Sequence, residues 1–359
     1  MKSTKEDPKP SRIWLRILKY LSMTVGGILL IAVALEASLK LRDNARLTMP
    51  GVMVDIGTHQ MHWWCQGENK GAPTVILDAG AIAFSTSWRA VMPLVAERTR
   101  VCAFDRSGLG WSEAGPGPWD ANQAAMELAS LLDATGETAP LIYVGHSLGA
   151  MFARVFASHY PERLAGLLLL EPADPDIIIR DLNEEREKPL TADLPETGCG
   201  MRCPLVVAAG LTGIPRWMLG SQEILQDPEL PRLAVDEFIA RSIKTGNLVH
   251  LVKMGRYFPR IFFQTLENRS LGDIPLIMGY GTESGKLLGD HENEEEWQAD
   301  YEDTLAAWRV TGGLSSRLLG MREVEGANHL SLVAYPEYAK SVDSMVNELL
   351  EASEPDGQQ

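Results

Sequence analysis

The sequence predicts an α/β fold, with a mostly parallel central sheet, helices on both faces and an inserted helical cap. Three observations lead to this prediction. From Pro50 onwards, short β-favouring runs alternate with helix-like segments, which is typical of parallel sheets covered by helices. The runs PTVILDAG and LAGLLLLEPA are apolar on both faces, as buried parallel strands are. A third run, LIYV, passes through GHSLG directly into a helix-like segment of small and apolar residues.

The chain is large enough for one core domain that carries an inserted subdomain, because 45% of its 359 residues are hydrophobic. Its charge is uneven. Residues 1–46 hold nine Lys/Arg and four Asp/Glu, so the remainder carries 24 against 44, a balance of −20. A body this acidic repels phosphate groups, which excludes nucleic acid as a partner.

Residues 1–46 are expected to form a basic N-terminus and a membrane anchor. Six cations precede the uncharged run Tyr20–Leu35, whose length falls between a signal-peptide core and a full span of about 20 residues. Trp14 suits an interface, and the nearby cations can snorkel outwards. By the positive-inside rule, the body then lies outside the cytoplasm. The alternative is secretion after cleavage near Ala32–Ala34.

The core is expected to comprise residues 47–173 and 273–351. Its first part predicts a hairpin, three alternating strands and helices, and a further strand. In order, these elements cover residues 52–56, 60–66, 73–80, 85–99, 100–104, 121–135, 140–146, 150–160 and 164–171. The second part predicts a strand near 274–281, a helix over 297–310, a strand near 316–326 and a helix over 331–352.

The alternation breaks over residues 174–272, which predict a mainly helical insertion with helices near 215–225, 233–244 and 248–266. The tail, residues 352–359, is expected to be disordered. The acidic run 290–303 is interpreted as a solvated helix N-terminus rather than a metal site, and no cofactor is expected.

The chain has four cysteines, at positions 65, 102, 199 and 203. Cys102 lies in an apolar run and is expected to be an ordinary core residue. Cys199 and Cys203 can pair if the body is extracytoplasmic. A zinc site is disfavoured, because no second Cys/His pair has suitable spacing.

The GHSLG segment matches the G-x-S-x-G nucleophile elbow, with a buried strand before it and a helix after it. Ser147 must occupy a very tight turn so that its hydroxyl projects from the sheet edge. Gly145 and Gly149 provide the small neighbours that such a turn requires. The helix that follows directs N–H groups and its positive dipole end at a developing oxyanion.

His329 is the expected general base. It follows a late strand and precedes the final helix, 182 residues after Ser147. This satisfies the chain order of serine, acid and histidine that belongs to this motif. The other six histidines lie in the first hairpin, beside the serine, at a helix end, in the insertion or at the acidic run.

Together these motifs resemble the α/β-hydrolase fold superfamily, in its serine-nucleophile, esterase-like or lipase-like branch with a helical cap. The resemblance runs from about Val52 to Leu350. VCAFDRSGLGWS is similar to the loop after the fourth strand, GHSLG to the elbow, and GANHLSLVAYPE to the histidine segment. The resemblance implies that the insertion is the family's cap, after the sixth strand.

The resemblance also implies an oxyanion hole. The His-Gly pair that many members carry after the third strand is replaced here, with Ala79 at the histidine position. The backbone N–H groups of Ala81 and Leu148 would form the hole, and such donors survive side-chain changes. Asp105 and Arg106 are interpreted as an internal ion pair that supports the loops beside the elbow.

The acid of the triad is less clearly marked. The usual position after the seventh strand holds Ser284, with Glu283 next to it. Some branches carry the acid after the preceding strand, which here ends in Glu171 with Asp174 close behind. A carboxylate buried at that edge needs a partner, and a histidine N–H provides one. Glu171 is the first candidate, and Glu283 and Asp174 are the alternatives.

A serine nucleophile excludes the relatives that use aspartate, and indicates acyl transfer to water. We expect a carboxylic ester hydrolase for apolar, lipid-like esters, since the cap is rich in apolar residues and an anchor keeps the enzyme near membranes. An acyltransferase, amidase or carbon–carbon bond hydrolase would use the same triad. A ligand-binding protein with little turnover is the alternative outside enzymes, and the oligomeric state is left open.

Overall fold

A computed structural model describes residues 12–184, 189–192, 202–226, 228, 230–285 and 293–353. These residues contain an eight-stranded sheet of order β1-β2-β4-β3-β5-β6-β7-β8. β2 pairs antiparallel with β1 and with β4, and the six strands β4, β3, β5, β6, β7 and β8 run parallel. The strands are β1 (Val52–Asp55), β2 (Gln60–Gln66), β3 (Val75–Asp78), β4 (Val101–Phe104), β5 (Leu141–His146), β6 (Leu164–Leu170), β7 (Leu276–Gly281) and β8 (Leu318–Val324). The predicted fold class is confirmed.

Helices cover both faces of this sheet. One face packs against α3 (Ala121–Thr135), α4 (Leu148–His159), α10 (Phe258–Glu267) and α11 (Glu294–Gly312). The other packs against η1 (Ser85–Trp88), α2 (Met92–Val95), α12 (Ser331–Ala334) and α13 (Ala339–Ala352). Successive strand side chains point to opposite faces. Tyr143 of β5 therefore enters the first core and Val144 the second, which explains the unbroken apolar runs.

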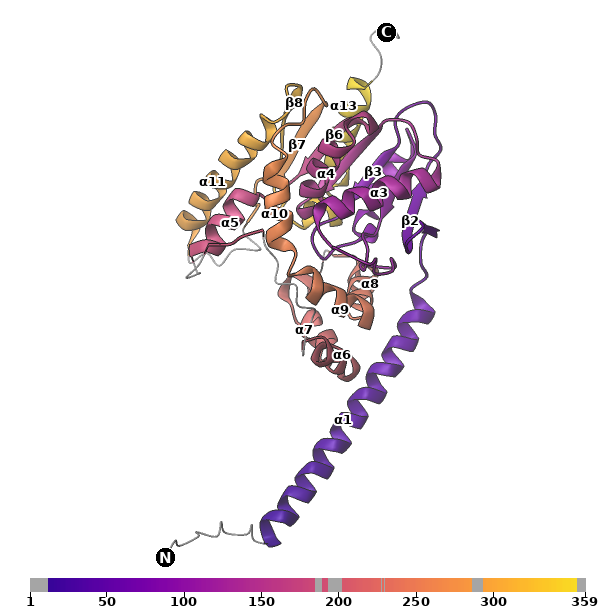
Figure 1. The fold of residues 1–359 in the computed structure, drawn as a ribbon, viewed down its shortest axis with the longest axis vertical. Helices are drawn as coiled ribbons and strands as arrows, with labels where there is room; N and C mark the ends of the chain where they lie inside the picture. The colour runs from indigo at the N-terminus through magenta and orange to yellow at the C-terminus, as the bar shows by residue number, and fades with distance from the viewer. Residues whose placement is uncertain are drawn as a thin grey trace, which may run out of the picture.

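The segment between β6 and β7 is helical. It contains α5 (Pro175–Glu184), α6 (Arg202–Thr212), α7 (Ile214–Gly220), η3 (Glu223–Gln226), α8 (Arg232–Ser242), α9 (Thr245–Met254) and α10. Figure 1 shows α6 to α9 gathered beyond one end of the sheet, while α10 returns along α4. Arg89 bonds Glu237 of α8 at 2.8 Å, and Phe84 stacks on Phe238, so α8 is attached to the core. That this segment is a separate cap with boundaries at 174 and 272 stays a prediction.

Three predicted helices are interrupted, and proline is involved in each case. The segment 331–352 forms α12 and α13, with Pro336 between them, and 248–266 forms α9 and α10, with Pro259 in the first turn of α10. The segment 85–99 forms only η1 and the single turn α2, which has Pro93 near its start. Proline lacks an N–H and clashes with the preceding turn, so it is tolerated only where a helix begins.

The N-terminal helix α1 (Arg12–Arg46) has 35 residues and projects from the body (Figure 1). Within the described residues it is the one unbroken helix that is long and apolar enough to cross a membrane, with a mean hydropathy of 2.0 in its most apolar window. At the other end, α13 closes at Ala352, and residues 354–359 of the predicted tail lie outside the described residues.

The cysteines are paired differently from our expectation. Cys65 of β2 lies opposite Cys102 of β4 and forms a disulfide with it, with Cα atoms 4.0 Å apart. The interpretation of Cys102 as an unpaired core residue was therefore wrong, because only the strand register brings the two thiols together. Cys203 is also disulfide-bonded, but Cys199 lies outside the described residues and its pairing with Cys203 stays a prediction.

Candidate active site

Ser147 stands at the junction of β5 and α4 in a backbone conformation that favours glycine, with φ 55° and ψ −120°. Hydrogen bonds hold this strained residue in place. Its N–H donates to the carbonyl of Leu170 at 2.9 Å, and its own carbonyl accepts from Ala150 at 3.0 Å and from Ala173 at 3.2 Å. Its side chain is partly exposed at the carboxyl edge of the sheet, where ligands of open α/β sheets bind.

The two flanking glycines leave no space for a side chain. A Cβ atom at Gly145 would lie 2.6 Å from the carbonyl oxygen of Gly149, and a Cβ at Gly149 would lie 2.6 Å from that of Asp78. Both neighbours are backbone atoms, which cannot move aside without disturbing the sheet. The turn therefore requires glycine at both positions for a steric reason.

Glu171 is buried directly after β6, with 1% of its surface exposed and φ 41°. Its Oε2 accepts a hydrogen bond from Nδ1 of His329 at 2.8 Å. Its Oε1 accepts from the N–H of Gly281 at 2.8 Å and from the hydroxyl of Ser284. An ionised carboxylate only accepts hydrogen bonds, so this contact places the proton of neutral His329 on Nδ1 and leaves Nε2 unprotonated.

His329 also contacts the residue that precedes Ser147. His146 donates from Nε2 to the carbonyl of His329 at 2.8 Å, and the two rings lie 4.6 Å apart between centroids. Burial, and then the charge of a protonated His329, lower the pKa of His146 well below its ordinary value, so His146 stays neutral. Within the described residues no hydrogen bond joins Ser147 Oγ to His329. Such bonds are often long before substrate binds.

The alternative acids occupy different surroundings. The carboxylate of Asp174 accepts from the N–H groups of Asp176 and Ile177 at the start of α5, at 2.9 and 3.1 Å. Glu283 lies in the turn after β7, where its backbone N–H donates to Ala327 at 2.9 Å. In the described part of the chain, Glu171 is the one acidic residue whose carboxylate is hydrogen-bonded to His329.

The expected ion pair between Asp105 and Arg106 is not formed, and this interpretation was wrong. Adjacent residues at the end of a strand point in opposite directions. Asp105 instead accepts from His62 Nδ1 at 3.0 Å and from the backbone N–H groups of Ser85 and Trp111. Burial lowers the pKa of His62, but its hydrogen bond and charge interaction with Asp105 outweigh this, and the net shift is upward.

Arg106 holds the loop that should contain the oxyanion hole. Its guanidinium bonds the carboxylate of Asp78 and the carbonyls of residues 79, 80 and 81, and it stacks 4.8 Å from the centre of the Phe152 ring. This clamp fixes the backbone beside Ser147. Sequence reasoning missed it, although Asp78 ends an apolar strand as abruptly as Glu171 does.

The two proposed oxyanion donors belong to this region. Leu148 is the first residue of α4, where N–H groups have no partner within the helix. Ala81 lies in the loop that Arg106 clamps, one residue after Gly80. A Cβ atom at Gly80 would lie 3.4 Å from the Cβ of Ser147, which places this loop against the serine.

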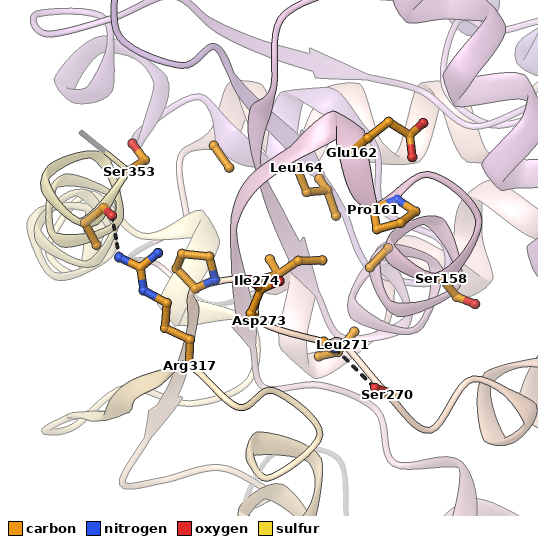
Figure 2. Close-up of a pocket in the computed structure, with 15 residues that line it drawn as sticks. Ser158, Pro161, Glu162, Leu164, Ser270, Leu271, Asp273, Ile274, Arg317 and Ser353 are labelled. Atoms are coloured by element: carbon orange, nitrogen blue, oxygen red, sulfur yellow. Dashed lines mark hydrogen bonds between the residues drawn. The ribbon is translucent and has the colours of Figure 1, made fainter. Parts of the chain in front are cut away.

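A crevice of about 700 Å³ reaches the acid and the histidine between α5 and α11. Its lining includes Glu171, Ser284 and His329 together with apolar side chains such as Ile177 and Trp308. A second hollow, of about 840 Å³, lies at the opposite end of the same strands. Figure 2 shows this second hollow, lined by residues near the amino ends of β6 to β8. It is remote from the site.

The described residues contain no group of three or more His, Cys, Asp or Glu side chains that could hold a metal ion. The predicted acidic helix start is present. α11 begins with three glutamates in its first turn, and Asn293 accepts a hydrogen bond from the N–H of Glu296 at 3.0 Å. These glutamates lie where the helix dipole favours negative charge.

Comparisons with known proteins point to one family. A profile of the alpha/beta hydrolase fold matches residues 73–191. An AB hydrolase superfamily protein of Gibberella zeae is 35% identical over 103 residues, covering 28% of this chain and 32% of its own. RutD of Azorhizobium caulinodans, a candidate carbamate hydrolase, is 29% identical over 169 residues, covering 46% and 61%. The chain thus spans less than two thirds of these relatives.

Solved structures share the fold. Potato epoxide hydrolase I has a TM-score of 0.61 at 18% identity, covering 84% of this chain and 98% of its own. A candidate lipase of Acinetobacter baumannii has a TM-score of 0.56 at 15% identity, and the match covers 88% of this chain and 96% of the lipase. A bacterial membrane phospholipase A has a TM-score of 0.55 at 18% identity, and the match covers 94% of this chain and 98% of the phospholipase. With the family profile and the sheet order, these likenesses show that the chain has the α/β-hydrolase fold.

Proposed function

We propose that this protein is a serine hydrolase that cleaves carboxylic esters with an apolar or lipid-like group. Ser147 is the nucleophile, His329 the general base and Glu171 the acid that orients it. The observation that carries this proposal is the 2.8 Å hydrogen bond from His329 Nδ1 to the buried Glu171 carboxylate, beside a serine held on a strained turn. It gives His329 the tautomer that a base needs.

In the proposed reaction, Ser147 Oγ attacks the ester carbonyl while Nε2 of His329 takes the hydroxyl proton. The negative charge on the carbonyl oxygen is stabilised by the N–H groups of Ala81 and Leu148. His329 returns the proton to the leaving alkoxide, which departs as an alcohol and leaves an acyl-enzyme. His329 then deprotonates a water molecule, whose attack releases the carboxylic acid and regenerates the serine.

The substrate class follows from the surroundings of the site. The segment between β6 and β7 is rich in Leu and Ile, which favours an apolar acyl or alcohol group. α1 is the proposed single-pass anchor, which keeps the enzyme beside lipids. The Cys65–Cys102 disulfide supports an extracytoplasmic body, because disulfides persist in oxidising compartments.

A fluorophosphonate probe tests the nucleophile directly. We expect stoichiometric labelling of the full-length protein and loss of labelling in Ser147→Ala, with Ser158→Ala as a control at a remote serine. A turnover screen over p-nitrophenyl esters of increasing chain length then defines the acyl group. Absence of labelling in the folded wild-type protein would refute the proposal and favour a ligand-binding protein.

The anchor is tested separately by topology. A reporter fused after Gln359 should be active only on the extracytoplasmic side, and the protein should remain in the membrane fraction after a high-salt wash. A reporter active only in the cytoplasm contradicts the proposed orientation. Recovery of the full-length chain in the soluble fraction contradicts the anchor itself.

A further inference from the structure

Helices α6 and α7 meet at a sharp apolar corner, residues 202–220. The chain turns at Gly213, which has a φ of 76°, and the two helix axes are bent by 76°. Taken together, the two helices are as long and as apolar as a membrane span, but the bend prevents a straight crossing. A bent pair of this kind is compatible with a broken membrane span or with a segment that enters a membrane surface and leaves on the same side.

The outward side of the α6–α7 corner is apolar and exposed. Trp217 is 72% exposed, and four further large apolar side chains are between 49% and 64% exposed. These four are Leu205, Leu211, Ile214 and Met218. The segment contains two cations, Arg202 and Arg216, and no acidic residue. Soluble surfaces rarely leave so many large apolar groups together without a partner that covers them.

The corner is fixed to α1 by buried charges. Arg216 of α7 donates from Nε to Glu36 at 2.8 Å and lies 2.8 Å from Asp43 through Nη1. Lys40 donates to the carbonyl of Gly210 in α6 at 2.8 Å. Glu36 and Asp43 are 2% and 6% exposed, so the contacts of Arg216 with these two carboxylates are shielded from water. The corner therefore sits at the level of residues 36–43 of α1.

That level coincides with the surface of a bilayer that α1 would cross. Residues 14–35 of a helix span about 33 Å, close to the roughly 30 Å hydrocarbon core. Glu36 is the first carboxylate after the uncharged run 20–35, so it lies at the boundary. Asp43 lies about 10 Å further out, within the headgroup layer. The contacts of Arg216 with Glu36 and Asp43 thus place the α6–α7 corner at the interface between the hydrocarbon core and the headgroups.

We infer that the α6–α7 corner is a second membrane contact, embedded in the interface of the leaflet from which α1 emerges. Its partner is the phospholipid bilayer, and Trp217 is its interfacial anchor. Figure 1 shows α6 and α7 at the end of the body beside α1 and away from the sheet, and among the described residues Trp217 and its apolar neighbours are left exposed. This inference rests on the proposed membrane anchoring by α1, and it places α6 and α7 against the lipid surface.

Tryptophan quenching by brominated lipids tests the contact in the full-length protein. The chain has nine tryptophans, of which Trp14 and Trp217 are strongly exposed. Wild type, Trp14→Phe, Trp217→Phe and the internal control Trp119→Phe are reconstituted in phosphatidylcholine vesicles with bromines at shallow or deep acyl positions. The difference between wild type and each variant isolates one tryptophan. Interfacial helices lie about 5–10 Å below the headgroup boundary, so the Trp217 signal should be lost mainly to shallow bromines.

The outcomes separate the corner from the anchor. Quenching of both Trp14 and Trp217, with no change for Trp119, supports the inference. Quenching of Trp14 alone supports the anchor and overturns the proposed membrane contact of the corner. Acrylamide, a quencher in the aqueous phase, then shows where Trp217 lies. Quenching of Trp217 by acrylamide means that it faces water, and protection from both quenchers means that a second protein copy covers it. Quenching of neither refutes the anchor and the inference together. Fluorophosphonate labelling of the same samples reports the proposed hydrolase function independently.

Discussion

Glu171 and His329 lie 158 positions apart in the sequence, yet Oε2 of Glu171 accepts a 2.8 Å hydrogen bond from Nδ1 of His329. The relationship arises because β6 and β8 run parallel and end at the same edge of the sheet. Ser284, at the position where the resemblance expects the acid, donates its hydroxyl to the other oxygen of Glu171. The carboxylate is thus held from two sides before any substrate binds.

The first prediction concerns the nucleophile and the base. Ser147→Ala and His329→Ala should each lower kcat by several orders of magnitude, because each removes a group from one proton-transfer unit. The double variant should be little worse than either single variant, since such residues act together. Steady-state kinetics on a p-nitrophenyl ester measure this, and near-wild-type turnover in either single variant contradicts the assignment.

The second prediction concerns the acid. Glu171→Gln should leave the protein folded but lower kcat by about 10³- to 10⁴-fold, because an amide neither selects the histidine tautomer nor stabilises the imidazolium. Glu283→Gln and Asp174→Asn are the matched controls and should be mild, since neither carboxylate is hydrogen-bonded to His329 in the described structure. A severe loss in one control combined with an active Glu171→Gln would move the role to that residue.

The third prediction concerns the clamp on the oxyanion loop. Arg106→Lys keeps the charge but loses the planar fork that bonds Asp78 and the carbonyls of residues 79–81. We expect kcat to fall by up to about 10²-fold through misplacement of the loop, with little change in KM. Arg154→Lys, at a buried arginine of α4, is the control. Equal losses in both variants would mean that Arg106 has only a structural role.

The fourth prediction concerns acid stability. Burial, followed by the charges of Lys253 and Arg106, lowers the pKa of His250 from 6.5 to about 4. The unfolded chain therefore gains a proton at His250 below about pH 6.5, while the folded protein does so only near pH 4. The contribution of His250 to the free energy of unfolding is complete above pH 6.5. It is lost as the pH falls towards 4, by an amount on the order of 3 kcal/mol.

His250→Gln should remove this contribution. Denaturant unfolding at pH 7 and pH 4.5 should show a smaller loss of stability on acidification in the variant than in wild type. His159→Gln, at an exposed histidine, should keep the wild-type dependence. An unchanged pH dependence in His250→Gln would show that His250 contributes nothing to acid sensitivity.

The fifth prediction concerns the disulfide. The Cys65–Cys102 bridge closes a segment of 37 residues, so its removal should lower the free energy of unfolding by about 4 kcal/mol through the entropy of the unfolded chain. The Cys65→Ala/Cys102→Ala protein should melt at a lower temperature than wild type. Alkylation of membranes before and after reduction provides the second measurement. Free Cys65 and Cys102 thiols before reduction would argue against an extracytoplasmic body.

The sequence by itself determined the fold class, the order of the strands and helices, and the position of the candidate nucleophile. These features depend on local patterns: apolar runs, the spacing of glycines around Ser147, and the length of the uncharged run in α1. The steric demand at Gly145 and Gly149 is a property of one turn, so five consecutive residues were sufficient to predict it. Proline interruptions are local too, because Pro259 and Pro336 are tolerated only where a helix begins or between helices.

Only the tertiary structure decided which distant side chains meet. The sequence offered Glu171, Glu283 and Asp174 as acids, and the parallel register of β6 to β8 brought Glu171 to His329. The antiparallel register of β2 and β4 paired Cys65 with Cys102, and the direction in which β4 ends gave Arg106 to Asp78 instead of Asp105. Such contacts depend on strand register and on the direction in which a strand ends, which are set by packing of the whole sheet rather than by any single segment.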